Sequence, residues 1–204
     1  MTLTADPHED HTRADDGREC DRGTDARSPR AAAPARTATV DTPDGPFTVV
    51  SFDGAVLASG WVADPEHLRR LIAPQIRPAQ LVEDRQLGTI TDAVARFYDG
   101  DASALEEVPV RQRGGPFIEH AWATLRSVPA GETVTYSQFA ELAGRPAAIR
   151  AAASACARNA AALFVPCHRV LRIDGALGGF RYGLEVKKSL IDRESASAAH
   201  DDRP

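Results

Sequence analysis

TYSQFAELAGRPAAIRAAASACARN, residues 135–159, indicates two short helices separated by a glycine. The first helix is predicted to end at Gly144, because a residue without a Cβ is favoured directly after a helix. The second is predicted over about 146–157, with Pro146 in the first turn, where the missing backbone N–H has no helical partner to lose. Two helices joined by a few residues around a glycine are typical of a helix-turn-helix.

The second of these helices is unusual in side-chain size. Over residues 147–157 nearly every side chain is small, and Arg150 is the only large polar one. One explanation is that alanine is the best helix former. Another is that a thin helix can lie close in a nucleic-acid groove, which in a minor groove would place Arg150 to enter the base stack. The residues alone leave both explanations open.

The preceding segment, residues 37–105, has the pattern of an α+β domain. Three β-rich runs are separated by the turn signals PDG and FDG, which predict a small antiparallel meander. PEHLRRLIA (65–73) and TITDAVARFYDG (89–100) carry apolar residues at helical spacing. No catalytic grouping stands out, so we interpret this domain as a scaffold.

After residue 111 the chain reads as mainly helical. FIEHAWATLRSV, residues 117–128, has one apolar helical face. The predicted fold class is therefore α+β, with a small sheet-and-helix N-terminal domain followed by a helical, winged-helix-like domain over 112–194. Residues 1–36 and 195–204 mix charged and small residues without an apolar period, so we expect two disordered tails.

Charge is distributed unevenly along the chain. The net charge is −5, but residues 111–194 carry 12 Lys and Arg against 7 Asp and Glu, whereas residues 38–110 carry 5 against 12. An anionic partner is thus compatible with the C-terminal half alone. A chance drift in surface charge is the alternative.

The cysteines and the apolar runs indicate the compartment. Cys20, Cys156 and Cys167 cannot all pair with one another, and the beginning of the chain lacks the apolar stretch of a signal peptide. The apolar runs fall far short of the roughly 18 residues of a membrane span. We expect a cytoplasmic protein that does not enter a membrane.

VPCHRV, residues 165–170, contains the candidate reactive thiol. A thiol is a strong nucleophile only as the thiolate, which requires a base or a positive environment, and His168 and Arg169 follow Cys167 directly. A buried cysteine is often only a small apolar residue. Here the preceding Pro166 fixes the backbone, and DGALGGFRYG (174–183) supplies glycines that let the backbone approach a flat ligand.

PCHRV, GALGGFRYG and LEVKKSLIDRE together resemble the O6-alkylguanine-DNA alkyltransferases, also called methylated-DNA–protein-cysteine methyltransferases. The resemblance continues upstream through SACARN, Arg150 and TYSQFAELAG and covers about 112–194. Over 37–105 it rests on position and general pattern alone.

The resemblance implies DNA repair by direct reversal in a single, irreversible turnover. An alkyl group, above all methyl, would pass from O6-alkylguanine, and less efficiently from O4-alkylthymine, to Cys167 after the damaged base is flipped out. The implied partner is double-stranded DNA, bound through its minor groove with low sequence specificity. We expect a monomer that uses no cofactor and no metal.

The resemblance also assigns roles at the thiol. Cys167 matches the alkyl acceptor, and His168 the residue that takes the thiol proton through a water. Glu194 matches the carboxylate that polarises the histidine. Asn159 matches the asparagine that ties this turn to the recognition helix. Tyr136 matches the tyrosine that helps rotate the nucleotide and donates a hydrogen bond to the guanine ring.

Further matches concern the DNA and the base pocket. Arg150 would fill the gap in the base stack, with Ala151 and Ser154 also against the DNA. The Val170 carbonyl would accept a hydrogen bond from the exocyclic amine of guanine, and the amide of residue 181 would donate to the guanine oxygen. Arg181 and Tyr182 would form the pocket rim. We expect Tyr182 to narrow the pocket, so that methyl adducts react well and O6-benzylguanine poorly.

The required chemistry agrees with these roles. A lesion at the guanine oxygen lies inside the duplex, so the base must leave the stack, at a cost of a few kcal/mol. The leaving group is a guanine oxyanion, which a hydroxyl and a backbone amide can stabilise. The thioether that forms is not readily hydrolysed, so each molecule reacts once.

Three other functions agree less well with these residues. A non-catalytic protein that marks alkylated bases would typically lack the cysteine, so Cys167 argues against it. A helix-turn-helix regulator would need several base-reading side chains on its second helix, which offers essentially Arg150. A cysteine hydrolase using Cys167 and His168 would leave the helix-turn-helix without a reason.

Overall fold

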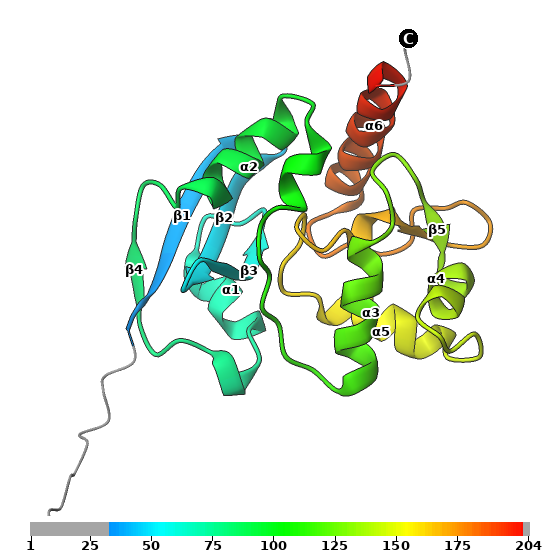
Figure 1. Ribbon diagram of the computed structural model, residues 1–204, viewed down its shortest axis with the longest axis horizontal. Helices are drawn as coiled ribbons and strands as arrows, with labels where there is room; N and C mark the ends of the chain where they lie inside the picture. Colours follow the sequence, from blue (N-terminus) through cyan, green and yellow to red (C-terminus); the bar gives the residue numbers. More distant parts are fainter. Residues whose placement is uncertain (1–32, 202–204) are drawn as a thin grey trace, which may run out of the picture. The chain divides into compact units, whose positions relative to one another are not determined.

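The computed structural model describes residues 33–201 and has a mixed α+β fold (Figure 1). Its strands are β1 (Ala35–Thr42), β2 (Gly45–Phe52), β3 (Ala55–Gly60), β4 (Leu81–Glu83), β5 (Val134–Thr135) and β6 (Val170–Leu171). Its α-helices are α1 (Pro65–Leu71), α2 (Thr89–Tyr98), α3 (Pro116–Arg126), α4 (Tyr136–Leu142), α5 (Ile149–Arg158) and α6 (Leu184–Asp201). Three 3₁₀ helices are η1 (Pro74–Ile76), η2 (Ala102–Leu105) and η3 (Cys167–Arg169). The predicted tail over 1–36 lies outside the described residues up to position 32.

The predicted antiparallel meander is confirmed. The strand order is β3-β2-β1-β4, with β1–β2 and β2–β3 antiparallel. The sequence missed β4, whose three residues pair in parallel with the start of β1. This pairing also corrects the predicted end of the N-terminal tail, because Ala35 is fully buried and opposite Leu81.

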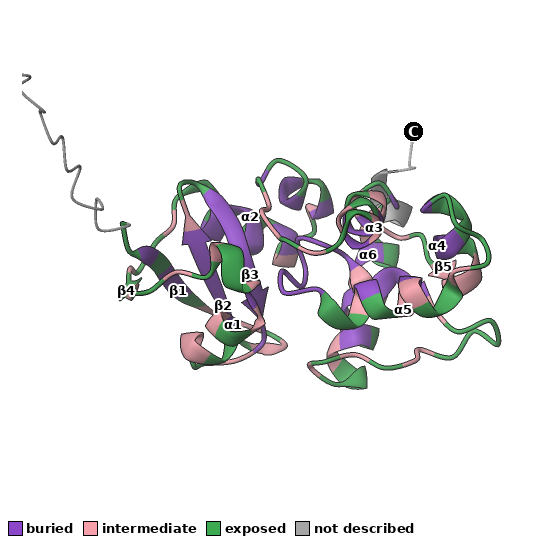
Figure 2. Cartoon of the chain, turned by 90° about the horizontal axis from the view of Figure 1, so that it is seen from below, coloured by how far each residue is buried: buried purple, intermediate pink, exposed green. Residues whose placement is uncertain are grey.

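Both faces of the sheet are covered. Neighbouring residues of a strand point to opposite faces, so Phe47 and Val49 join the core that contains α2, whereas Val50 joins the smaller core that contains Leu68 of α1. Every residue of β3 is buried as a result. Figure 2 shows this buried sheet and the mixed burial around α5.

The helical half of the chain, residues 116–201 from α3 to α6, forms as its apolar spacing predicts. Helix α3 buries Ile118, Ala121, Trp122 and Leu125, one face at i, i+3, i+4 and i+7. Trp122 Nε1 donates to the Ala155 carbonyl at 2.9 Å, which ties α3 to α5. Helix α4 begins with a capping box at Thr135 and ends before Gly144, which has a positive φ of 73°.

Helix α5 begins later than predicted. Its first residue is Ile149, so Pro146 lies before the helix rather than in its first turn. The chain instead makes a turn in which the Ala148 amide donates to the Arg145 carbonyl at 2.8 Å. A proline disfavours helical backbone geometry at the residue before it, here Arg145, which agrees with a turn at this point.

The last helix continues past the predicted boundary. The composition predicts that order ends at about Ser195, whereas α6 runs to Asp201. The Ser195 hydroxyl donates to the Ile191 carbonyl and that of Ser197 to the Gly100 carbonyl, and the alanines here favour a helix. The predicted C-terminal tail was therefore wrong over 195–201, and residues 202–204 are outside the described part.

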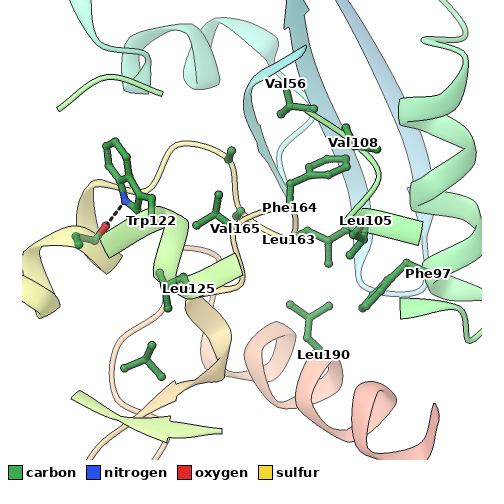
Figure 3. Close-up of a cluster of buried hydrophobic side chains, with 14 of the residues drawn as sticks. Val56, Phe97, Leu105, Val108, Trp122, Leu125, Leu163, Phe164, Val165 and Leu190 are labelled. Carbon is green, nitrogen blue, oxygen red and sulfur yellow. Dashed lines mark hydrogen bonds between the residues drawn. The ribbon is translucent and has the colours of Figure 1, made fainter. Parts of the chain in front are cut away.

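One core joins the two halves of the chain. The sheet half is residues 35–105, from β1 to η2. Figure 3 shows its residues Val56 and Phe97 in the same cluster as Leu125 of α3, Leu190 of α6 and the segment Leu163–Val165. That segment leads directly to Cys167. Within residues 33–201, no helix has both the length and the apolar character needed to cross a membrane.

The outer edge of β3 fixes the path of the chain toward Cys167. The Ser59 amide donates to the Ala160 carbonyl at 2.9 Å, and the Ala162 amide donates to the Ser59 carbonyl at 3.2 Å. The Ser59 hydroxyl adds a bond of 2.6 Å to the Ala162 carbonyl. Residues 160–162 thus extend the sheet as a short parallel partner of β3.

Candidate active site around Cys167

The backbone before Cys167 has two unusual conformations. Leu163 is buried with a φ of +75°, a region that a side chain with a Cβ rarely occupies. Pro166 has φ −80° and ψ 62°, and the Cys167 amide donates to the Val165 carbonyl at 2.8 Å, which is an inverse γ-turn. The chain then enters η3, which leaves Cys167 half-buried at the surface of the core.

Asn159 connects α5 to the thiol. Its side-chain amide lies 2.8 Å from the Val165 carbonyl and 3.3 Å from Cys167 Sγ. Its oxygen accepts from Gln112 Nε2 at 3.0 Å and from the Ala161 amide at 3.1 Å. The side chain is 3% exposed, and these bonds hold its amide toward the sulfur.

His168, Arg169 and Glu194 form a buried charged cluster. His168 Nε2 lies 2.9 Å from Glu194 Oε1. The Arg169 guanidinium donates to both carboxylate oxygens, from Nε at 2.9 Å and from Nη2 at 2.8 Å. Arg169 also donates to the Val128 carbonyl. Glu194 is 1% exposed, so His168 and Arg169, rather than water, compensate its charge.

The cluster fixes the orientation of the histidine ring. Burial would raise the pKa of Glu194, but the charge of His168 and hydrogen bonds from His168 and Arg169 outweigh it and lower the pKa to about 2. A carboxylate can only accept, so His168 Nε2 donates to Glu194 and Nδ1 is the ring nitrogen that faces away from this bond. Nδ1 is buried and has no hydrogen-bond partner among residues 33–201. It is therefore the ring nitrogen left available for proton exchange.

The thiol itself is not pre-ionised. Burial raises the pKa of Cys167, and the Asn159 amide, Lys187 and Arg181 oppose that rise only in part. At neutral pH the sulfur retains its proton. A base that takes this proton during the reaction is consequently needed for nucleophilic attack.

Lys187 is a site residue that sequence reasoning missed. It is fully buried, and its Nζ donates to the Val170 carbonyl at 2.6 Å and to the Leu177 carbonyl. It thereby joins the strand after Cys167 to the glycine loop. Its spacing from Leu190 and Glu194 on α6 was the available signal, because the three positions share one helical face.

Arg169 and Gln112 were missed as well. Arg169 was noted as a neighbour of the thiol, but its bond to Glu194 joins two segments 25 residues apart, which spacing does not reveal. Gln112 accepts from the Ala160 amide at 2.8 Å and donates to Asn159. No local pattern marks it.

The pairing of two short strands places Tyr136 near the strand that begins at Val170. Parallel pairing of β5 with β6 sets Thr135 opposite Leu171, so Tyr136, the next residue, lies beside the strand that leaves Cys167. Tyr136 is half-buried, and a Cβ added to Gly178 would lie 3.6 Å from its hydroxyl. Burial raises the pKa of Tyr136, so the hydroxyl keeps its proton at neutral pH.

Tyr182 packs against the sheet half. Its hydroxyl donates to the Ser59 carbonyl at 3.2 Å, and its ring centroid lies 5.5 Å from that of Trp61. A Cβ on Gly60 would lie 2.0 Å from the Tyr182 hydroxyl oxygen, so only glycine leaves room for this ring. The neighbouring Arg181 is exposed and donates to the Ala157 carbonyl at 2.5 Å.

The predicted DNA-contacting residues lie apart from the thiol cluster. Arg150 and Ser154 are exposed, one helical turn apart on α5, and Ala151 is half-buried. The Ser154 hydroxyl donates to the Arg150 carbonyl at 2.9 Å, while the Arg150 guanidinium makes no hydrogen bond to another described residue. Asn159, at the end of α5, is the link between this face and Cys167.

Comparisons with known proteins find relatives of most of the chain. Residues 116–196 match the family model described as 6-O-methylguanine DNA methyltransferase, DNA binding domain. The methylated-DNA–protein-cysteine methyltransferase of Shigella flexneri is 31% identical over 158 residues, which are 76% of this chain and 92% of that protein. The bifunctional transcriptional activator/DNA repair enzyme Ada of Escherichia coli is 49% identical over 88 residues, but the match spans 25% of its length.

The fold is similar to solved structures over most of its length. The crystal structure of Mycobacterium tuberculosis O6-methylguanine methyltransferase has a TM-score of 0.66 and 26% identity, covering 80% of this chain and 94% of that one. The same protein in complex with DNA also has a TM-score of 0.66. The chain belongs to the methylated-DNA–protein-cysteine methyltransferase family.

Proposed function

We propose that this protein repairs DNA by moving an alkyl group, above all methyl, from O6 of guanine to Cys167, once per molecule. The observation that carries the proposal is the buried Glu194–His168 pair, which leaves Nδ1 of a histidine next to the half-buried Cys167 without a hydrogen-bond partner among residues 33–201. O4-alkylthymine is a weaker substrate of the same site.

The chemical step is a displacement at the alkyl carbon. The thiol proton passes through a water to His168 Nδ1, and Glu194 stabilises the resulting imidazolium. Cys167 Sγ forms a bond to the alkyl carbon, and the bond from that carbon to the guanine oxygen breaks. The electron pair stays on guanine, where the Tyr136 hydroxyl and the backbone amide of residue 181 stabilise the charge by hydrogen bonds. The product is a stable thioether.

Access to the damaged base requires base flipping. In our proposal α4 and α5 form a helix-turn-helix whose second helix enters the minor groove, with Ala151 and Ser154 against the DNA. Arg150 is exposed and unpaired among the described residues, as a side chain that replaces a flipped base in the stack must be. The base then enters between Tyr136 and the Val170 carbonyl, whose second lone pair remains available beside the Lys187 bond.

The organisation implied by this function extends the proposal. Residues 112–194 carry DNA binding and alkyl transfer, and residues 37–105 support them. The protein acts as a monomer in the cytoplasm, and phosphate contacts make DNA binding salt-dependent with low sequence specificity.

Intact-mass spectrometry tests the proposal directly. The full chain is incubated with a duplex that contains one O6-methylguanine, and the modified peptide is located by proteolysis. We expect a gain of one methylene mass, on Cys167 alone and never more than once per molecule. Tight binding of the lesion without a mass gain would instead indicate a protein that marks damage.

A further inference from the structure

A groove of about 750 Å³ lies beside the C-terminal end of α5. Five arginines line it, and none of its described lining residues is acidic. They come from α1, the segment after η1, the loop before α3, the end of α5 and the glycine loop: Arg70, Arg77, Arg113, Arg158 and Arg181. Positive charge that converges on one hollow is suited to bind an anion.

Two of these arginines are free of competing partners. The side chains of Arg70 and Arg158 are exposed, and neither makes a hydrogen bond or ion pair with another residue of 33–201. Arg77 and Arg181 donate to backbone carbonyls, which leaves further guanidinium donors available. Arg113 is partly neutralised by Glu119 at 3.5 Å.

The groove continues the outward face of α5. Arg150, Ser154 and Arg158 are spaced at i, i+4 and i+8, so they share one side of the helix. At 1.5 Å per residue, Arg158 lies about 12 Å along the axis from Arg150. One end of this stripe is therefore the proposed stack-filling arginine, and the other end, Arg158, lines the groove together with Arg70 and Arg77.

We propose that this groove binds backbone phosphates of the DNA that flanks the flipped nucleotide. The DNA interface would then extend from α5 onto residues 70–77 of the N-terminal half, which so far has only a supporting role. The inference rests on the proposed function. DNA is the favoured anion because Arg158, which lines the groove, shares one side of α5 with Arg150.

The test is the salt dependence of DNA binding. Fluorescence anisotropy with a duplex containing one O6-methylguanine gives Kd at a series of salt concentrations. The pair Arg70→Gln and Arg158→Gln is expected to weaken binding at least tenfold at low salt. Each lost phosphate contact removes about 0.9 from the slope of log K against log salt, so the slope should fall by about 2. Each single variant should remove about 1.

Matched variants separate charge from structure. The pair Arg70→Lys and Arg158→Lys keeps the charge and is expected to retain most of the affinity. Arg85→Gln removes an exposed arginine outside the groove and should leave Kd and slope unchanged. Wild-type Kd and slope in the glutamine pair would overturn the inference, and so would an equal loss in the lysine pair.

The proposed function is checked on the same duplex. Alkyl transfer by the wild-type protein is measured first by intact mass. A wild-type protein that transfers no alkyl group would contradict the proposed function. A protein that transfers the group while the glutamine pair binds like wild type would contradict only the role of the groove.

Discussion

The sheet half and the helical half of this protein bury different kinds of polar side chain. In the sheet half the buried polar residues are all hydroxyl-bearing: Thr37, Thr48, Ser51, Ser59 and Thr91. In the helical half they carry an amide, an imidazole or a charge: Asn159, His168, Arg169, Lys187 and Glu194. Both halves share one apolar core, so the difference does not reflect a difference in burial.

The difference shows that the residues around Cys167 are buried at a cost in stability that the sheet half does not bear. A buried hydroxyl needs one hydrogen bond, whereas a buried charge carries a desolvation penalty of several kcal/mol that a partner must offset. In the helical half, the buried charges of Arg169, Lys187 and Glu194 near Cys167 carry this desolvation penalty. The sheet half, through Ser59 and Gly60, supplies backbone positions that hold the segment before the cysteine and the ring of Tyr182.

The largest expected effect separates the two cysteines of the helical half. Cys167→Ala should abolish alkyl transfer, because Cys167 Sγ is the sulfur that the Asn159 amide holds at 3.3 Å, next to His168 in the chain. Cys156→Ala should keep transfer, since Cys156 packs against the core and burial raises its pKa far above neutral. Intact mass after incubation with O6-methylguanine DNA measures both. A mass gain in Cys167→Ala would refute the assignment of the acceptor.

Removing the buried charge at position 194 should affect both rate and stability. Glu194→Gln leaves Arg169 without its anion, and breaking such a pair costs about 3–5 kcal/mol of unfolding free energy. The single-turnover rate should fall roughly 100-fold, within the range for proton transfer by a positioned group. Urea unfolding and quenched-flow alkyl transfer measure the two effects.

The control for that variant is Glu185→Gln, an exposed acid on the same helix α6. It should change stability by about 0.5 kcal/mol or less, as is usual for surface substitutions. A Glu194→Gln protein as stable and as fast as this control would show that the charged cluster serves neither purpose.

Acid should weaken the helical half through the same carboxylate. The pKa of Glu194 falls from 4.5 to about 2 on folding, so its contribution is complete above pH 4.5 and is lost as the pH falls toward 2. The loss is on the order of 3 kcal/mol. Urea unfolding at pH 6, 4 and 3 should show it in wild type. Glu194→Gln should lack this component, and an identical pH dependence in both proteins would count against the assignment.

The smallest expected effect tests the contribution of the sheet half to selectivity. Gly60→Ala places a Cβ where the Tyr182 hydroxyl lies, so the ring must move away from Trp61. If Tyr182 narrows the base pocket, reaction with O6-benzylguanine should rise relative to O6-methylguanine by roughly tenfold. Competition kinetics measures the ratio. Tyr182→Phe keeps the ring and should leave the ratio near that of wild type. An unchanged ratio in Gly60→Ala would show that Tyr182 does not narrow the base pocket.

Local patterns predicted most of the secondary structure. Apolar residues at helical spacing identified α2 and α3, and the turn signals at 43–45 and 52–54 identified the meander, because these patterns are written in neighbouring residues. Strand β4 was missed since three residues show no alternation. The start of α5 and the end of α6 were misplaced because a turn at 145–148 and a contact between Ser197 and Gly100 involve the surrounding chain.

The site divides in the same way. The sequence by itself determined the family, the acceptor candidate Cys167 and its neighbour His168, because the motif that carries them is contiguous. Only the tertiary structure decided that Glu194 reaches His168, that Lys187 joins Val170 to the glycine loop, and that Gly60 admits Tyr182. These contacts join segments far apart in the chain. Their energies depend on burial and on atomic distance, which no spacing in the sequence records.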